Sequence, residues 1–177
     1  MRKRLFWWSV AGFLWTSAAG TLLHFLYEWN GGAVTAVLGA VNESVWEHMK
    51  LLVIPAVLLT AVQIWTIGGM YPQLPAARAV SIPAGALAIP VLYYTLTGAL
   101  GTLPTWVHIS MFFLVTAGMF LLDHRLMCAA LPKAGWVQFL AAAALWIVAF
   151  FFVWCTFRPP ELPLWKDPVT GMYGLAR

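Results

Sequence analysis

The sequence predicts an all-α membrane protein, a bundle of five transmembrane helices. Of its 177 residues, 62% are hydrophobic and 9% are charged, whereas a soluble domain is about half apolar and about a quarter charged. The mean hydropathy is +0.82, and the chain contains apolar runs long enough to cross a hydrocarbon layer of about 30 Å. We therefore treat residues 1–177 as one integral membrane domain.

Turns rich in Gly and Pro separate the expected spans. The first run covers about 23 residues, which exceeds the apolar core of a secretory signal peptide and suits a membrane span. Residues 33–38 follow it and are too few to cross, so we expect a short interfacial or re-entrant segment there. Pro55 predicts a kink in the second span, and Pro83 and Pro90 predict interruptions of the third. The spans are expected at residues 5–27, 45–67, 80–100, 105–126 and 136–157.

The tail, residues 158–177, is rich in Pro and Gly but is not purely polar. Large apolar side chains recur in it, which is unusual for a disordered segment. The sequence therefore favours a tail that folds back onto the helices. These apolar residues are Leu162, Leu164, Trp165, Met172 and Tyr173.

Basic residues in the short loops indicate the orientation, because cytoplasmic loops carry the excess of Lys and Arg. The Arg2-Lys3-Arg4 cluster favours a cytoplasmic N-terminus and an external C-terminus. A net charge of +4, dispersed along the chain, gives no nucleic-acid-binding surface. The basic residues expected inside are Arg2, Lys3, Arg4, Arg78, Arg125 and Lys133, with Arg78 in a loop expected at residues 70–79. The basic residues expected outside are Lys50, Arg158, Lys166 and Arg177.

This orientation gathers the titratable residues at one end of the bundle. Asp123 and His124 remain at the inner end, where we expect Asp123 to pair with Arg125. An ionisable group next to hydrocarbon is costly and marks a functional site by default. The sequence thus predicts a polar site at the external end. The residues expected there are Glu28, Glu43, Glu47, Glu161, Asp167, His24, His48 and His108.

Two segments carry the candidate chemistry. His24 and Glu28 are four residues apart and share one helix face, and residues 41–50 hold two more carboxylates and a histidine just before an apolar run. The tail emerges at the same end, so it is a candidate lid. The predicted catalytic residues are His24, Glu28, Glu43, Glu47 and His48, and the predicted ligand contacts are Trp46, His108 and Asp167.

A structural role is also open for part of this segment. Ser44 and Glu47 have the spacing of a capping box at a helix start, and Glu47 lies three residues from Lys50, within ion-pair reach. The capping alternative accounts for Glu47 and Lys50. It does not account for Glu43 and His48.

Both metal-bound and metal-free chemistry fit these residue types. His24, Glu28, Glu43 and His48 are possible ligands of a divalent metal such as zinc, although no His-Glu-x-x-His motif is present. Carboxylates in a dry cavity could equally act as general acid and base without a metal.

The function hypotheses follow from that site. The first is an enzyme that acts on a membrane lipid or isoprenoid-like substrate by acid-base or metal-assisted chemistry. The second is a non-catalytic binding or transport protein for a small amphiphile or an ion. Serine-type acyl hydrolysis is disfavoured, because no Gly-x-Ser-x-Gly motif occurs.

Three stretches of the chain together carry a resemblance to a known family. Residues 22–29 (LLHFLYEW), 41–50 (VNESVWEHMK) and 162–174 (LPLWKDPVTGMYG) resemble a small bacterial membrane-protein family catalogued as domain of unknown function 6512. The resemblance implies five membrane helices and a joint role for the three stretches, but no activity. A weaker likeness, resting on His24-x-x-x-Glu28, is to the emopamil-binding-protein-like sterol isomerases, whose lipid-sized cavities are lined by acidic and aromatic residues.

Overall fold

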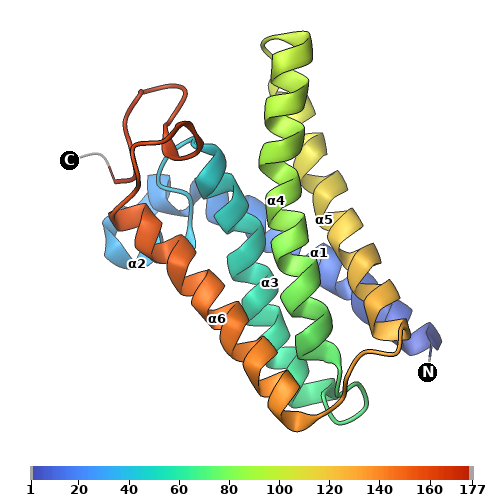
Figure 1. Ribbon diagram of the computed structural model, residues 1–177. Coiled ribbons are helices and arrows are strands. Elements are labelled where there is room, and N and C mark those ends of the chain that lie inside the picture. The colour runs from blue at the N-terminus through green and yellow to red at the C-terminus, as the bar shows by residue number, and fades with distance from the viewer. Residues whose placement is uncertain (1, 176–177) are drawn as a thin grey trace.

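The structure, a computed structural model, describes residues 2–175, and its main elements are all helices (Figure 1). Within this range the one β-type contact is an isolated antiparallel bridge between Lys166 and Tyr173. The elements are α1 (Arg2–Asn30), α2 (Gly32–Leu38), α3 (Val45–Ile67), α4 (Leu74–Leu100), α5 (Thr105–Cys128), α6 (Gly135–Phe157) and the 3-10 helix η1 (Pro163–Trp165).

Five of these helices are long and apolar enough to cross a membrane, which confirms the predicted number of spans. They are α1, α3, α4, α5 and α6. The short segment expected after the first span is α2, whose 7 residues cannot cross a bilayer. All five long helices extend beyond or match the predicted ranges.

Helix α3 is the centre of the bundle. It packs against α1, α2, α4, α6 and η1, and 61% of its most apolar 18-residue window is buried, against 28% in each of the other four long helices. The contact with α1 is close because Gly20 has no side chain: a Cβ there would lie 2.8 Å from the Leu51 carbonyl oxygen. The backbones of α1 and α3 therefore approach each other closely at this point.

Helix α4 begins earlier than predicted. The loop expected at residues 70–79 ends at residue 73, because Pro75 stands in the first turn of α4, where a helix does not need its missing N–H. Pro83 and Pro90 lie inside the helix without ending it, as neighbouring helices permit in membrane bundles.

The early start of α4 corrects two expectations about charge. Arg78 is a buried helix residue, 1% exposed, and not a loop residue. Its Nε lies 3.1 Å from Asp123 Oδ1 on α5, so the predicted pairing of Asp123 with Arg125 is wrong. Arg125 is exposed in the last turn of α5.

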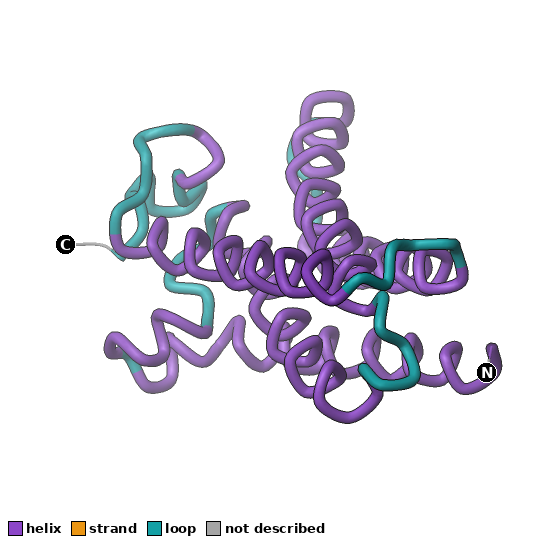
Figure 2. The backbone as a smooth tube through the Cα atoms, turned by 60° about the horizontal axis from the view of Figure 1, so that its bottom comes forward, coloured by secondary structure: helices purple, strands orange, loops and turns teal. Residues whose placement is uncertain are grey.

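The two ends of the bundle are different in character. The N-terminus and the C-terminal tail lie at opposite ends in both views (Figures 1 and 2). The tail folds back as predicted: η1 packs on α3, and the Leu175 amide donates to the Thr156 carbonyl of α6 at 3.2 Å. We call the end with the tail, α2 and the start of α3 the tail end, and the other the N-terminal end.

Candidate functional site

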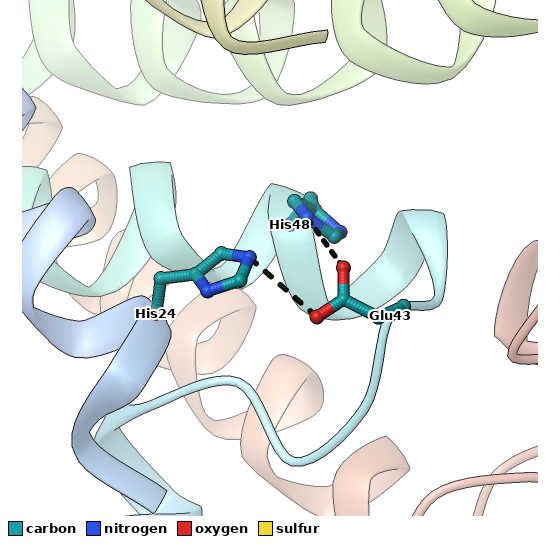
Figure 3. Close-up of side chains that lie close together, drawn as sticks. All are labelled: His24, Glu43 and His48. Carbon is teal, nitrogen blue, oxygen red and sulfur yellow. Dashed lines mark ion pairs between the residues drawn. The ribbon is translucent and has the colours of Figure 1, made fainter. Parts of the chain in front are cut away.

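Three of the predicted residues converge at the tail end and form what we call the His/Glu cluster: His24 of α1, Glu43 of the loop before α3, and His48 of α3 (Figure 3). One potential ligand atom from each lies within 4.8 Å of the other two. His24 Nε2 is 3.7 Å from Glu43 Oε1, and His48 Nε2 is 3.6 Å from Glu43 Oε2. The carboxylate thus faces both imidazole rings.

These distances are too long for direct hydrogen bonds, which weaken well before 3.6 Å. Separations of this size are typical of two groups that both bind one ion or one water molecule. Ligands bound at about 2.1 Å in a tetrahedron lie roughly 3.4 Å apart, so shifts of a few tenths of an ångström would bring each His–Glu pair to that spacing. A single ion bound by all three residues would also have to draw together ligand atoms that lie up to 4.8 Å apart.

A backbone contact fixes the orientation of His48. Its Nδ1 lies 2.9 Å from the Ser44 carbonyl oxygen. A carbonyl cannot donate, so Nδ1 carries the proton of this hydrogen bond. In the neutral ring, Nε2 is then the atom with a free lone pair, and it faces Glu43. A backbone carbonyl that holds the far nitrogen of a histidine in this way is typical of metal ligands.

His24 is held differently. Its Nδ1 is buried and has no hydrogen-bond partner among the described residues. The ring instead packs against Phe25 and against His48, with centroid distances of 4.9 and 5.2 Å. Its orientation therefore depends on packing and on whatever its Nε2 binds.

The loop of residues 39–44 carries Glu43 to the cluster, and it rests directly on α1. The Ala40 amide donates to the Leu23 carbonyl at 3.3 Å. Gly39 permits this approach, because a Cβ there would come 2.5 Å from the same carbonyl oxygen. The loop is thus fixed one residue away from His24.

A second anchor joins this loop to a buried ion pair. The Val41 amide donates to Glu47 Oε2 at 3.3 Å, and that same oxygen lies 2.5 Å from Lys50 Nζ. Thr156 of α6 donates to Glu47 Oε1 at 2.7 Å and accepts from Lys50 Nζ at 2.9 Å. Lys50 also donates to the Ala36 carbonyl of α2. This network joins α2, α3, α6 and the loop.

The tail provides the third anchor. Asn42 Oδ1 accepts from the Ser44 amide, and Asn42 Nδ2 donates to the Gly174 carbonyl, both at 2.9 Å. All three stretches that carry the family resemblance therefore meet at this loop.

A hollow of about 280 Å³ opens beside the cluster. Glu28 lines it and is exposed, so it stands near the cluster without joining it. The adjoining surface of α1 is aromatic, since Phe25 and Trp29 stack at 5.8 Å and are both exposed. The full lining is His24, Tyr27, Glu28, Ala40, Val41, Asn42 and Glu43.

The structure places Glu47 apart from the cluster. It is 1% exposed and paired with Lys50, as the structural alternative expected. It also accepts a hydrogen bond from Thr156, which the sequence did not indicate. Ser44 caps α3 by accepting from the Glu47 amide at 3.3 Å, whereas the Glu47 carboxylate reaches Val41 and not the Ser44 amide.

The predicted ligand contacts also lie elsewhere. Trp46 is buried, stacked on Phe152 at 4.1 Å. His108 packs against Tyr93 at the start of α5. Asp167 is buried in the tail, where its carboxylate accepts from the Val169 amide and the Thr170 hydroxyl. These contacts support packing and turn roles for the three residues.

Sequence reasoning missed two residues that support the site. Thr156 carries no signal in the sequence, because a lone threonine in an apolar helix is common and usually bonds its own backbone. Gly39 was visible as part of a Gly-punctuated stretch, but its contact partner on α1 was not.

Comparison with known proteins identifies a family for the chain but gives it no activity. No curated protein and no solved structure matches the chain, and the weaker likeness to sterol isomerases gains no support. The sequence profile of one family matches residues 3–175, nearly the whole chain. The chain therefore belongs to the family of unknown function DUF6512.

Proposed function

We propose that the protein is a membrane enzyme that acts on a lipid or isoprenoid-like substrate at the tail end, with a divalent metal such as zinc held by His24, Glu43 and His48. The observation that carries this proposal is the convergence of two imidazoles on one carboxylate beside an open hollow. Each imidazole lies 3.6–3.7 Å from one oxygen of Glu43, and one ligand atom from each residue lies within 4.8 Å of the others. Two His and one Glu, with one position left open, is a donor set of catalytic zinc sites.

Each residue has a distinct part in the proposed chemistry. A metal bound there would polarise a substrate oxygen or make a bound water more acidic. Glu28, an exposed residue that lines the same hollow, would move a proton without being needed as a ligand. The exposed aromatic pair Phe25 and Trp29 supports an amphiphilic substrate, because aromatic rings favour the membrane interface.

Metal content and lipid turnover test the proposal together. The purified protein should retain zinc, and incubation with a membrane lipid extract should change the abundance of at least one lipid by mass spectrometry. Glu43→Gln and His48→Ala should lose both properties, and Glu28→Gln should lose turnover and keep the metal. His108→Ala is the matched control, since His108 lies outside the cluster. Equal metal content and equal turnover in all four variants would overturn the proposal.

A second candidate function, transport of an ion or small amphiphile, is favoured by the buried pair of Arg78 and Asp123. Ionisable residues inside a helix bundle often mark transport pathways. Uptake of zinc into proteoliposomes that depends on both Asp123 and the His/Glu cluster would support transport. Turnover with no uptake would support the enzyme.

A further inference from the structure

A second hollow, of about 190 Å³, lies at the N-terminal end, opposite the His/Glu cluster. It is formed where the start of α1, the turn between α3 and α4, and the end of α5 meet. Its chemistry differs from that of the first hollow, because no acidic residue lines it. The lining residues are Leu5, Met70, Tyr71, Gln73, Met127, Cys128 and Lys133.

Gln73 gives this hollow a specific polar requirement. Its side chain is 7% exposed, and its Nε2 donates to the Met127 carbonyl at 2.9 Å. Its Oε1 is buried and has no hydrogen-bond partner among the described residues. Buried polar groups are normally satisfied, so this acceptor can take a hydrogen bond from a donor in the hollow, either a water molecule or a ligand hydroxyl.

The rim of the hollow is positively charged. Lys133 lines it, and Arg4 contacts the lining residue Met70, with Arg4 Nη1 at 3.6 Å from Met70 Sδ. Lys3 and Arg125 are exposed at the same end. Among residues 2–175, the acidic residue at this end is Asp123, which is buried against Arg78. Nothing in that range therefore neutralises the exposed cations.

We propose that this hollow binds the headgroup of an anionic glycerophospholipid that carries a free hydroxyl, as phosphatidylglycerol does. The phosphate would pair with Lys133 and Arg4, and the hydroxyl would donate to Gln73 Oε1. Basic pockets between membrane helices are known to hold anionic headgroups. Exposed Trp7 and Trp136 at the same end support a position at headgroup depth. The site is independent of the function proposed for the tail end.

The chain contains its own reporter for this site. Cys128 lines the hollow and is exposed, whereas Cys155 is buried. Maleimide labelling of the folded protein therefore reads access to the hollow. In nanodiscs, phosphatidylglycerol should slow labelling of Cys128 relative to phosphatidylcholine alone. Phosphatidylmethanol, which has the phosphate but no hydroxyl, should protect less.

Variants separate specific binding from general attraction to an anionic surface. Lys133→Gln should weaken the protection about fivefold, since one basic residue near an anionic surface contributes about that factor. Lys166→Gln, a matched change of an exposed lysine at the tail end, should leave it unchanged. Native mass spectrometry should show less phosphatidylglycerol retained by Lys133→Gln than by the wild type.

Other results would overturn the assignment. Equal labelling in all lipids would exclude the site, and equal protection by phosphatidylmethanol would exclude the role of Gln73. Protection in detergent by inorganic phosphate alone, at the strength seen with lipid, would show an ion site and not a lipid site.

Discussion

The Glu47 carboxylate lies 2.5 Å from the Lys50 ammonium, with both side chains essentially fully buried. Lys50 also donates to Ala36 and to Thr156, and the loop amide of Val41 donates to Glu47. A cap residue at an exposed helix start would contribute only about 1 kcal/mol. Removing one partner of a buried ion pair is more serious, because the other charge is left uncompensated.

We therefore expect Glu47→Gln to lower the free energy of unfolding by about 3–5 kcal/mol. This exceeds the effect of about 1 kcal/mol that a simple capping role would give. Thermal unfolding in detergent, followed by tryptophan fluorescence, measures it. The double variant Glu47→Gln, Lys50→Met should recover part of the loss, because no charge remains buried alone. A single variant as stable as the wild type would contradict the network.

The Arg78–Asp123 pair leads to a parallel expectation. Asp123→Asn removes the counter-charge of a guanidinium that is 1% exposed, so it should destabilise the protein by about 3–5 kcal/mol. Arg125→Gln, two residues away and exposed, should change stability by less than about 0.5 kcal/mol. The same unfolding assay compares the two, and similar losses from both would argue against the pairing.

Gly39→Ala should disturb the His/Glu cluster while leaving the bundle folded. The new Cβ would meet the Leu23 carbonyl oxygen at 2.5 Å, which would push the loop and Glu43 away from His24. Zinc retention should fall by at least tenfold, since ligand positions matter within a few tenths of an ångström. Gly69→Ala is the control, because a Cβ at that position would meet no described residue within 4 Å other than its chain neighbours. Unchanged zinc retention in Gly39→Ala would show that the loop does not position the cluster.

Metal retention should decrease as the pH falls. Histidine binds a metal only in its neutral form, so protons compete with the metal. Free imidazole side chains titrate near pH 6.5, and two histidines act together here. Bound zinc should therefore be retained at about pH 7.5 and released as the pH falls toward about 5.5. Dialysis at each pH, followed by elemental analysis, tests this. Release that increases with rising pH would point to different ligands.

The orientation of the bundle gives a further prediction. Single cysteines introduced at positions 43 and 161, in a background with Cys128 replaced, should react with an impermeant reagent from outside intact cells. A cysteine at position 133 should react only after the membrane is opened, because the positive N-terminal end is expected inside. Opposite results for positions 43 and 161 would contradict a common tail end.

The sequence alone determined the number of spans and the end of the bundle where titratable groups gather. Apolar runs of about 20 residues can satisfy their backbone groups only as helices in a bilayer, so local composition was enough. Consecutive antiparallel spans joined by a short segment bring their adjoining ends together, so the sequence also predicts that His24 and Glu28 approach Glu43 or Glu47. His24 and Glu43 do meet, whereas Glu28 and Glu47 are not part of the group.

Tertiary structure decided which charged residues belong to the cluster. Glu43 and Glu47 are alike in sequence, four residues apart near one helix start. Thr156 and Lys50 lie around Glu47 and take its carboxylate into a buried network, whereas Glu43 is left facing two histidines. Likewise, the sequence alone indicates that Arg78 is a basic loop residue, and only the packing of α5 shows that it pairs with Asp123. Thr156 lies 109 positions from Glu47 along the chain, and Asp123 lies 45 positions from Arg78. The strength of a charge pair depends on distance and burial. Only the packing of the helices sets those two quantities.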